Sequence, residues 1–381
     1  MTENTVTPSV TFCITELDIG GAEKALVRIA IGLQDTGWRV RVISLRNAGA
    51  MADPLRAAGI PVTALGCGSF ADIRALWRLS AEFRQNPTDL VQCFLHQANI
   101  YGRLAIRCCG RRGDHRRRPL VVSGVRVADR RRWVILTDRW TRAYSDHYVA
   151  VSEHVAATHA ELCRLNRDVV TSIPNGVDVP AELMDAPNPA PHTLLSVGRL
   201  TTQKAPFDLL EAFRLLPDDL RRQCKLNFVG DGPLAFSLQK AIDRLQLNDR
   251  VQLERHSHDV LQLMRESTVL VLASRWEGMP NVVLEAMANA LPVVATSIDG
   301  IRELIDDGTT GWLVPAATPA ALAERIATAL GDPESRTSVA RNAQAKVSQH
   351  FSWASAIERY DQLLRNLLAN RPADHAAKKR I

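Results

Sequence analysis

The chain has 381 residues, 46% of them apolar, and a formal net charge of +6, which suits a globular protein with two domains of ordinary size. No uninterrupted apolar run approaches the roughly 18 residues that a membrane-spanning helix needs, and the stretch from Met1 to Ser9 carries no secretion signal, so we expect neither membrane spanning nor export. The seven cysteines are scattered and form no Cys-x-x-Cys pair, which is typical of buried thiols in a reducing cytoplasm.

In chain order, the first half alternates short apolar runs with helical patterns. Helical patterns at residues 25–33, 71–83 and 98–108 lie between the runs, and this alternation predicts a parallel sheet with helices on both faces. The predicted strands are Val10–Thr15, Val40–Leu45, Pro61–Leu65, Leu90–Leu95, Leu120–Val125, His147–Val151 and Val169–Ile173.

Three of these strands are followed by residues that suit a ligand site. Gly20 and Gly21 form a glycine corner after the first strand, where the backbone can approach a phosphate or a sugar closely. His96 stands at the carboxyl end of the fourth strand and Arg126 follows the fifth, at the sheet edge where open α/β sheets bind ligands. A structural role for His96 and a solvated surface position for Arg126 stay open as alternatives.

The excess positive charge lies in the first half, where residues 101–140 alone carry 12 arginines. This patch, Arg103 to Arg132, predicts a polyanionic partner such as an anionic membrane surface. A helix face that is merely solvated is the alternative. A nucleic-acid partner is the weakest interpretation, because few large aromatic residues accompany the arginines and no base-stacking motif is visible.

A turn at Asn175-Gly176 and a proline-rich stretch predict an interdomain linker, since proline fits neither a helix interior nor a central strand. We therefore expect one domain over residues 1–183, a second over residues 192–350, and a C-terminal helix and tail over residues 351–381. The predicted strands of the second domain are Thr193–Val197, Lys225–Val229, Val251–Leu253, Thr268–Ala273, Leu291–Ala295 and Trp312–Val314.

The corners after these strands carry the chemistry of a phosphate or sugar site. Arg199 and Lys204 bracket the corner after the first strand and can converge on a diphosphate, and Gly230 lies in a glycine turn after the next. The strand ending at Ala273 is followed by a loop and then a helix. Pro280 is expected at the first position of that helix. The amides of Asn281, Val282 and Val283 would then face an anion, flanked by the acids Glu277 and Glu285.

These motifs resemble those of the family-four retaining glycosyltransferases. The resemblance covers nearly the whole chain and includes Gly20-Gly21-Ala22-Glu23, Pro174-Asn175-Gly176-Val177-Asp178, Gly198-Arg199 with Lys204, Gly230-Asp231-Gly232-Pro233, and Glu277 with Glu285. It implies the GT-B fold, in which two Rossmann-like domains with doubly wound parallel sheets face a deep cleft. The amphipathic pattern that follows Trp353 is expected to form a helix crossing between them.

The resemblance also implies roles for single residues. Arg199, Lys204, Glu277 and His96 are the expected catalytic residues, and Gly20, His96 and Arg126 are expected on the acceptor side. The donor would contact Gly21, Arg199, Lys204, Gly230, Glu277, Asn281, Val282, Val283 and Glu285. Ala205 and Leu253-Glu254-Arg255 depart from the family pattern near the base, so the nucleotide is not assigned.

The function implied is a retaining hexosyl transfer from a nucleotide sugar to a glycan or lipid-linked acceptor in bacterial-type cell-surface polysaccharide biosynthesis. No metal and no cofactor are expected, since the sequence has no Asp-x-Asp motif and the two cations can stabilise the leaving phosphate. We expect a cytoplasmic enzyme, peripheral on the inner face of the cell membrane if the arginine patch touches lipid. A sugar-nucleotide 2-epimerase of the same architecture is the alternative.

Overall fold

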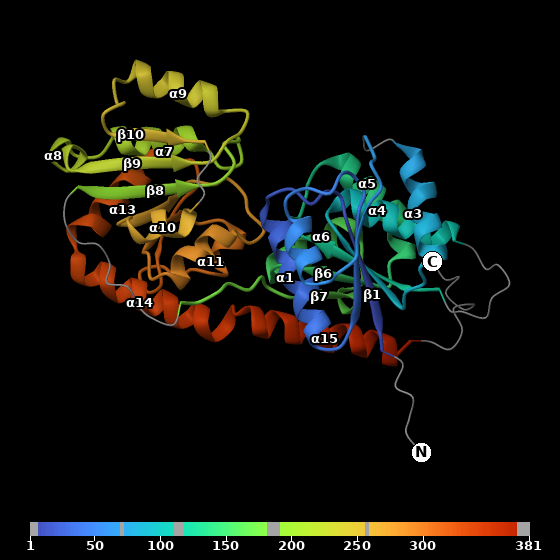
Figure 1. The fold of residues 1–381 in the computed structure, drawn as a ribbon. Helices are drawn as coiled ribbons and strands as arrows, with labels where there is room; N and C mark the ends of the chain where they lie inside the picture. The colour runs from blue at the N-terminus through green and yellow to red at the C-terminus, as the bar shows by residue number, and fades with distance from the viewer. Residues whose placement is uncertain (1–6, 69–71, 110–117, 181–190, 256–258, 372–381) are drawn as a thin grey trace. The chain divides into compact units, whose positions relative to one another are not determined.

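The structure is a computed structural model that describes residues 7–68, 72–109, 118–180, 191–255 and 259–371. The chain divides into two compact units, one formed by Met1–Pro174 with Trp353–Ile381 and the other by Asn175–Ser352 (Figure 1). This division falls just before the Asn175-Gly176 turn, and it assigns the last helix to the first unit. The proline-rich stretch predicted as a linker falls mostly on residues 181–190, outside the described residues.

The first unit is built on a seven-stranded sheet of order β3-β2-β1-β4-β5-β6-β7, in which all neighbouring strands are parallel. Its strands are β1 (Ser9–Ile14), β2 (Arg39–Ser44), β3 (Val62–Ala64), β4 (Leu90–Phe94), β5 (Leu120–Val125), β6 (His147–Ala150) and β7 (Val170–Ser172). Each lies within two residues of the predicted bounds, because continuous apolar runs are typical of strands buried on both faces.

Helices cover both faces of this sheet. Alternate residues of β1 point to opposite faces. Phe12 joins a core with α1 and α15, and Cys13 joins a core with α3 and α4. The helices are α1 (Gly21–Asp35), α2 (Ala52–Ala57), α3 (Ile73–Gln85), α4 (His96–Cys108), α5 (Arg132–Thr141), α6 (Glu153–Cys163) and α15 (Trp353–Ala369), with short 3-10 turns at Arg142–Tyr144 and Arg167–Val169.

The second unit repeats the plan with a six-stranded parallel sheet of order β10-β9-β8-β11-β12-β13. Its strands are β8 (His192–Val197), β9 (Cys224–Val229), β10 (Val251–Glu254), β11 (Val269–Leu272), β12 (Val293–Thr296) and β13 (Trp312–Val314). Its helices are α7 (Pro206–Arg214), α8 (Asp218–Arg222), α9 (Ala235–Arg244), α10 (Val260–Arg265), α11 (Asn281–Ala288), α12 (Asp299–Arg302), α13 (Pro319–Gly331) and α14 (Pro333–His350). Two doubly wound parallel-sheet domains confirm the predicted fold class.

The last helix, α15, packs against α1 within the first unit. A Cβ added to Gly32 would lie 2.2 Å from Ile357 Cδ1, so the glycine lets the two helices approach closely. Trp38 Nε1 donates to Asp361 Oδ1 at 2.6 Å, and Tyr360 and Leu364 enter the core. Within the part of the chain that the structure describes, no helix combines the length and the apolar content needed to cross a bilayer.

Candidate active site

The carboxyl edge of the second sheet holds several tight corners in direct contact. The Gly198 amide donates to Val229 O at 2.9 Å, and the Leu200 amide donates to Asp231 O at 2.9 Å, so the corners after β8 and β9 are tied together. A Cβ added to Gly300, in the corner after β12, would lie 2.5 Å from Gly278 O in the corner after β11. The glycines therefore let the loops after β8 and β9 approach each other closely, and likewise the loops after β11 and β12.

Gly230 is the position where this packing depends most on glycine. Its φ is +138°, and an added Cβ would lie 2.2 Å from the Gly198 carbonyl oxygen. We expect Gly230→Ala to lower the free energy of unfolding by about 1–3 kcal/mol, the scale of a strained backbone position. Chemical denaturation measures this. Gly331→Ala is the matched control, because Gly331 ends α13 with open space around it, and a similar loss there would contradict the assignment.

Lys204 and Glu277 meet at this edge. Lys204 Nζ lies 2.6 Å from Glu277 Oε1, and the Ser274 hydroxyl donates to the same oxygen at 2.8 Å. The amide of Gln203 lies 3.4 Å from Glu277 Oε2 and 2.9 Å from the Trp276 carbonyl oxygen. The Glu277 side chain is only 8% exposed, so its carboxylate is held in one orientation by three neighbours.

This meeting point coincides with the topological switch point of the sheet. Lys204 lies in the loop after β8 and Glu277 in the loop after β11, and β8 and β11 are neighbours whose chains continue to opposite sides of the sheet. Open α/β sheets bind ligands in the crevice at such a point. An ammonium group and a carboxylate there can bind an anion and sugar hydroxyls respectively.

Other predicted donor residues belong to the same loops and helix. Arg199 follows Gly198 and is exposed, and within the described ranges it pairs with no acidic side chain. Glu285 lies in the second turn of α11 and is half-buried. The structure thus joins Lys204 directly to Glu277, and it places Arg199 and Glu285 on elements of the same edge.

The start of α11 differs from the expectation. Pro280 is the N-cap residue with an extended backbone, and the helix begins at Asn281, not at the proline. The Val283 amide donates to Pro280 O at 3.0 Å and is therefore not free for an anion, which corrects that assignment. Asn281 Oδ1 accepts from Asn175 Nδ2 at 2.6 Å, so the Asn175-Gly176 turn packs against the start of the helix.

In the first unit, Gly20, Gly21, His96 and Arg126 all follow adjacent strands at one sheet edge. Gly20 caps α1 after β1, His96 is the first residue of α4 after β4, and Arg126 follows β5. Arg126 is half-buried, with its guanidinium 5.6 Å from the centre of the Phe94 ring, and burial lowers its pKa. The Arg126 guanidinium is therefore partly shielded from water.

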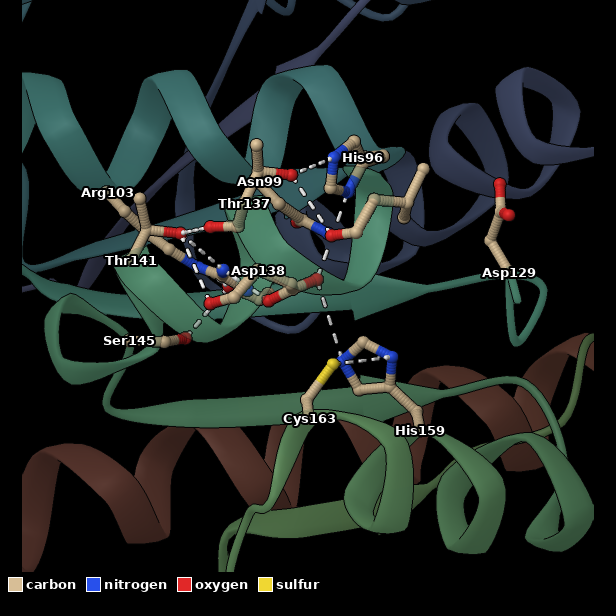
Figure 2. Close-up of polar contacts among 12 residues, drawn as sticks. His96, Asn99, Arg103, Asp129, Thr137, Asp138, Thr141, Ser145, His159 and Cys163 are labelled. Atoms are coloured by element: carbon tan, nitrogen blue, oxygen red, sulfur yellow. Dashed lines mark hydrogen bonds and ion pairs between the residues drawn. The ribbon is translucent and has the colours of Figure 1, made fainter. Parts of the chain in front are cut away.

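His96 is held by helix α5, as Figure 2 shows. Its Nε2 lies 3.0 Å from Thr137 Oγ1, and its Nδ1 lies 3.8 Å from Asp138 Oδ2. The residue before it, Leu95, has φ +71° and ψ 155°, a costly conformation for leucine that is typical of functional sites. Two partners and a strained preceding residue fix the position of this imidazole.

Asp138 is the centre of a buried polar cluster. Arg103 Nη1 lies 2.5 Å from Asp138 Oδ1 and 3.0 Å from Thr141 Oγ1, and His159 Nε2 lies 3.7 Å from Asp138 Oδ2 (Figure 2). Burial lowers the pKa of His96 and of His159, and the Asp138 charge opposes this only in part. Burial also acts to raise the pKa of Asp138, but the charges of Arg103 and His159 outweigh it, so this pKa is lowered.

This cluster corrects the predicted arginine patch. Arg103 is fully buried, with 0% of its side chain exposed, so it cannot belong to a surface that meets a polyanion. Asp138, His159 and Cys163 also place three possible metal ligands within 4.8 Å of one another, but the guanidinium already neutralises the carboxylate and would repel a cation. Sequence reasoning missed Asp138, although it is the only acid in the arginine-rich helix α5.

Comparisons with known proteins agree with this architecture. Residues 19–180 match the family model described as Glycosyltransferase Family 4, and residues 185–346 match the one described as Glycosyl transferases group 1. The structure resembles the crystal structure of Anabaena Alr3699/HepE in complex with UDP and glucose, with a TM-score of 0.82, 22% identity, and coverage of 94% of this chain and 100% of that one.

Two relatives illustrate the sequence similarity. The putative colanic acid biosynthesis glycosyltransferase WcaL of Salmonella typhimurium is 33% identical over 189 residues, which span only 46% of this chain and 46% of that protein. An Escherichia coli UDP-Gal:alpha-D-GlcNAc-diphosphoundecaprenol alpha-1,3-galactosyltransferase is 26% identical over 283 residues, 69% of this chain and 71% of that protein.

Proposed function

Because this chain belongs to the family-4 glycosyltransferases and has the GT-B architecture, we propose that it transfers a sugar from a nucleotide-sugar donor to a glycan or lipid-linked acceptor in polysaccharide biosynthesis. The contact of Lys204 with Glu277 at the switch point of the second sheet carries this proposal. The named substrates of the relatives support it, since one of them uses a UDP-sugar and a lipid diphosphate acceptor.

In the proposed reaction the second unit holds the donor. The diphosphate draws the Lys204 ammonium toward it and is bound also by Arg199, whose planar guanidinium suits a phosphate. Glu277, kept in place by Ser274, then accepts hydrogen bonds from hydroxyls of the donor sugar. Glu285 binds the ribose hydroxyls.

The leaving phosphate is stabilised without a divalent metal in this proposal. Two cations at one corner can neutralise the charge that develops as the bond to the sugar breaks. Gly21 and the start of α11 would approach the donor, and the configuration at the sugar carbon would be retained. We place the reaction in the cytoplasm, at the inner face of the membrane that carries the acceptor.

A panel of nucleotide sugars tests the proposal. We expect one class, among UDP-, GDP-, ADP- and dTDP-sugars, to raise the melting temperature of the purified protein, since a ligand at a hundred times its Kd stabilises by about 2.7 kcal/mol. With that donor and lipid-linked glycan acceptors, NMR of the product then reports the configuration of the new bond. The absence of stabilisation by any nucleotide sugar would contradict the proposal.

The same donor without an acceptor separates transfer from epimerisation. A transferase should leave the sugar's ring configuration unchanged under these conditions, whereas a sugar-nucleotide 2-epimerase would convert it. Conversion without acceptor would therefore replace the proposed function by the alternative.

A further inference from the structure

Helix α5 carries an apolar stripe on its exposed side. Leu136 is 61% exposed and Trp140, one turn later, is 72% exposed, and Trp133, one turn before Leu136 on the same side, is also exposed. The opposite side of the helix is buried through Val134, Asp138 and Thr141. Leu136 and Trp140 therefore leave most of their apolar surface in water, and Trp133 leaves nearly half of its surface in water.

A second pair of exposed apolar residues lies on α3. Ile73 and Trp77 are one turn apart, and Trp77 is 61% exposed. Helix α3 packs against α4, and α4 packs against α5, so the three helices form one layer on the same face of the sheet (Figure 1). We call the outer side of this layer, with Ile73, Trp77, Trp133, Leu136 and Trp140, the α3–α5 surface.

Exposed arginines accompany this surface. Arg107, Arg130 and Arg132 are exposed, and within the described ranges none of them pairs with an acidic side chain. The acids at the helix starts are already paired, Asp72 with Arg74 and Asp129 with Arg131. The uncompensated charge of the surface is therefore positive.

We propose that the α3–α5 surface docks on an anionic phospholipid bilayer. Tryptophan prefers the boundary between headgroups and acyl chains, and transfer of leucine and isoleucine side chains from water to this boundary is energetically favourable. Each arginine near the membrane surface contributes about 1 kcal/mol of binding free energy through its attraction to anionic headgroups. A nucleic acid would use the positive charge but would leave Ile73 and Leu136 in water, so the composition favours lipid.

Docking would also reach the acceptor side of the first unit. The partly exposed Thr137 and the buried Asp138, both on α5, hold His96, so the helix that meets the bilayer also positions this imidazole. The usefulness of this arrangement rests on the proposed function, because only a lipid-linked acceptor would be delivered there. The Trp133 ring centre lies 5.4 Å from that of His96, so Trp133 is left unchanged in the test.

Vesicle flotation of the full chain tests the docking without any sugar transfer. We expect binding to phosphatidylcholine vesicles containing phosphatidylglycerol, weakened by salt. Leu136→Ser/Trp140→Ser should lower the partition coefficient at least about tenfold, equal to about 1.4 kcal/mol. Phe236→Ser is the matched control, because Phe236 is a similarly exposed aromatic residue on α9 of the second unit, and its binding should match the wild type.

Three outcomes would overturn the proposal. The first is no binding of the wild type to anionic vesicles, and the second is an equal loss of vesicle binding in the control and in the double variant. The third is a concentration-dependent dimer in analytical ultracentrifugation that the double variant abolishes. Such a dimer would assign the surface to a second copy of the chain. Stabilisation by a nucleotide sugar is measured separately, so failure of docking and failure of the proposed function are distinguishable.

Discussion

Lys204→Ala is expected to lower kcat/KM for sugar transfer by about a hundredfold or more, the scale of losing one preorganised electrostatic partner. The ammonium lies 2.6 Å from the Glu277 carboxylate, and both groups are largely shielded from water, so its charge acts with little screening. Removing the Lys204 ammonium deprives the leaving phosphate of a stabilising cation, and it leaves the Glu277 carboxylate without its counter-ion. Steady-state assays with the donor found in the nucleotide-sugar panel measure the loss.

Two further variants sharpen this result. Lys240→Ala changes an exposed lysine of the same unit whose Nζ lies 4.4 Å from the centre of the Phe236 ring, and it should transfer sugar at the wild-type rate. Glu277→Gln keeps the shape of the side chain but removes its charge, and it should also lower turnover about a hundredfold. Wild-type turnover in a folded Lys204→Ala or Glu277→Gln protein would refute the role of that residue.

The second large effect is on stability. Asp138→Leu is expected to lower the free energy of unfolding by about 3–5 kcal/mol, because it leaves the Arg103 charge buried without its partner. Arg103 is completely inaccessible to solvent, and its Nη2 already lacks a hydrogen-bond partner. Denaturation by urea, followed by circular dichroism, measures the difference.

A double variant separates the charge effect from loss of packing. Arg103→Met/Asp138→Leu replaces both charges by apolar groups of similar size and should recover most of the lost stability. Asp219→Ala removes the partner of Arg222 in an exposed pair and should cost about 1 kcal/mol or less. If the double variant were as unstable as Asp138→Leu, the loss would not come from the unpaired charge.

The lowered pKa of Asp138 gives this pair a pH dependence. The folded state binds the proton of this carboxyl less readily than the unfolded state, so the contribution is present above the unfolded pKa of about 3.9 and is lost as the pH falls through the folded value. The wild type should therefore lose more stability in acid than the double variant does.

Local features of the sequence predicted most elements of the fold. The strand from Leu120 to Val125 has the predicted bounds, because an apolar run followed by a polar residue is a local signal. The prediction at Pro280 was wrong by one residue, since proline suits both the N-cap and the first helical position. The Val283 amide is paired for a different reason, because the first turn of α11 is tightened by an i to i−3 hydrogen bond from this amide to the Pro280 carbonyl.

By itself, then, the sequence determined two series of parallel strands with glycine corners at their carboxyl ends, because periodicity and turn chemistry act over a few residues. Only the tertiary structure decided which corners meet. The order β9-β8-β11-β12 brings Lys204 to Glu277, although the strands before them are separated in the chain by two others. Packing likewise decided which arginines are buried. Arg103 and Arg132 both stand in helical stretches of the arginine-rich segment, but Arg103 is buried and paired with the Asp138 carboxylate, whereas Arg132 is exposed.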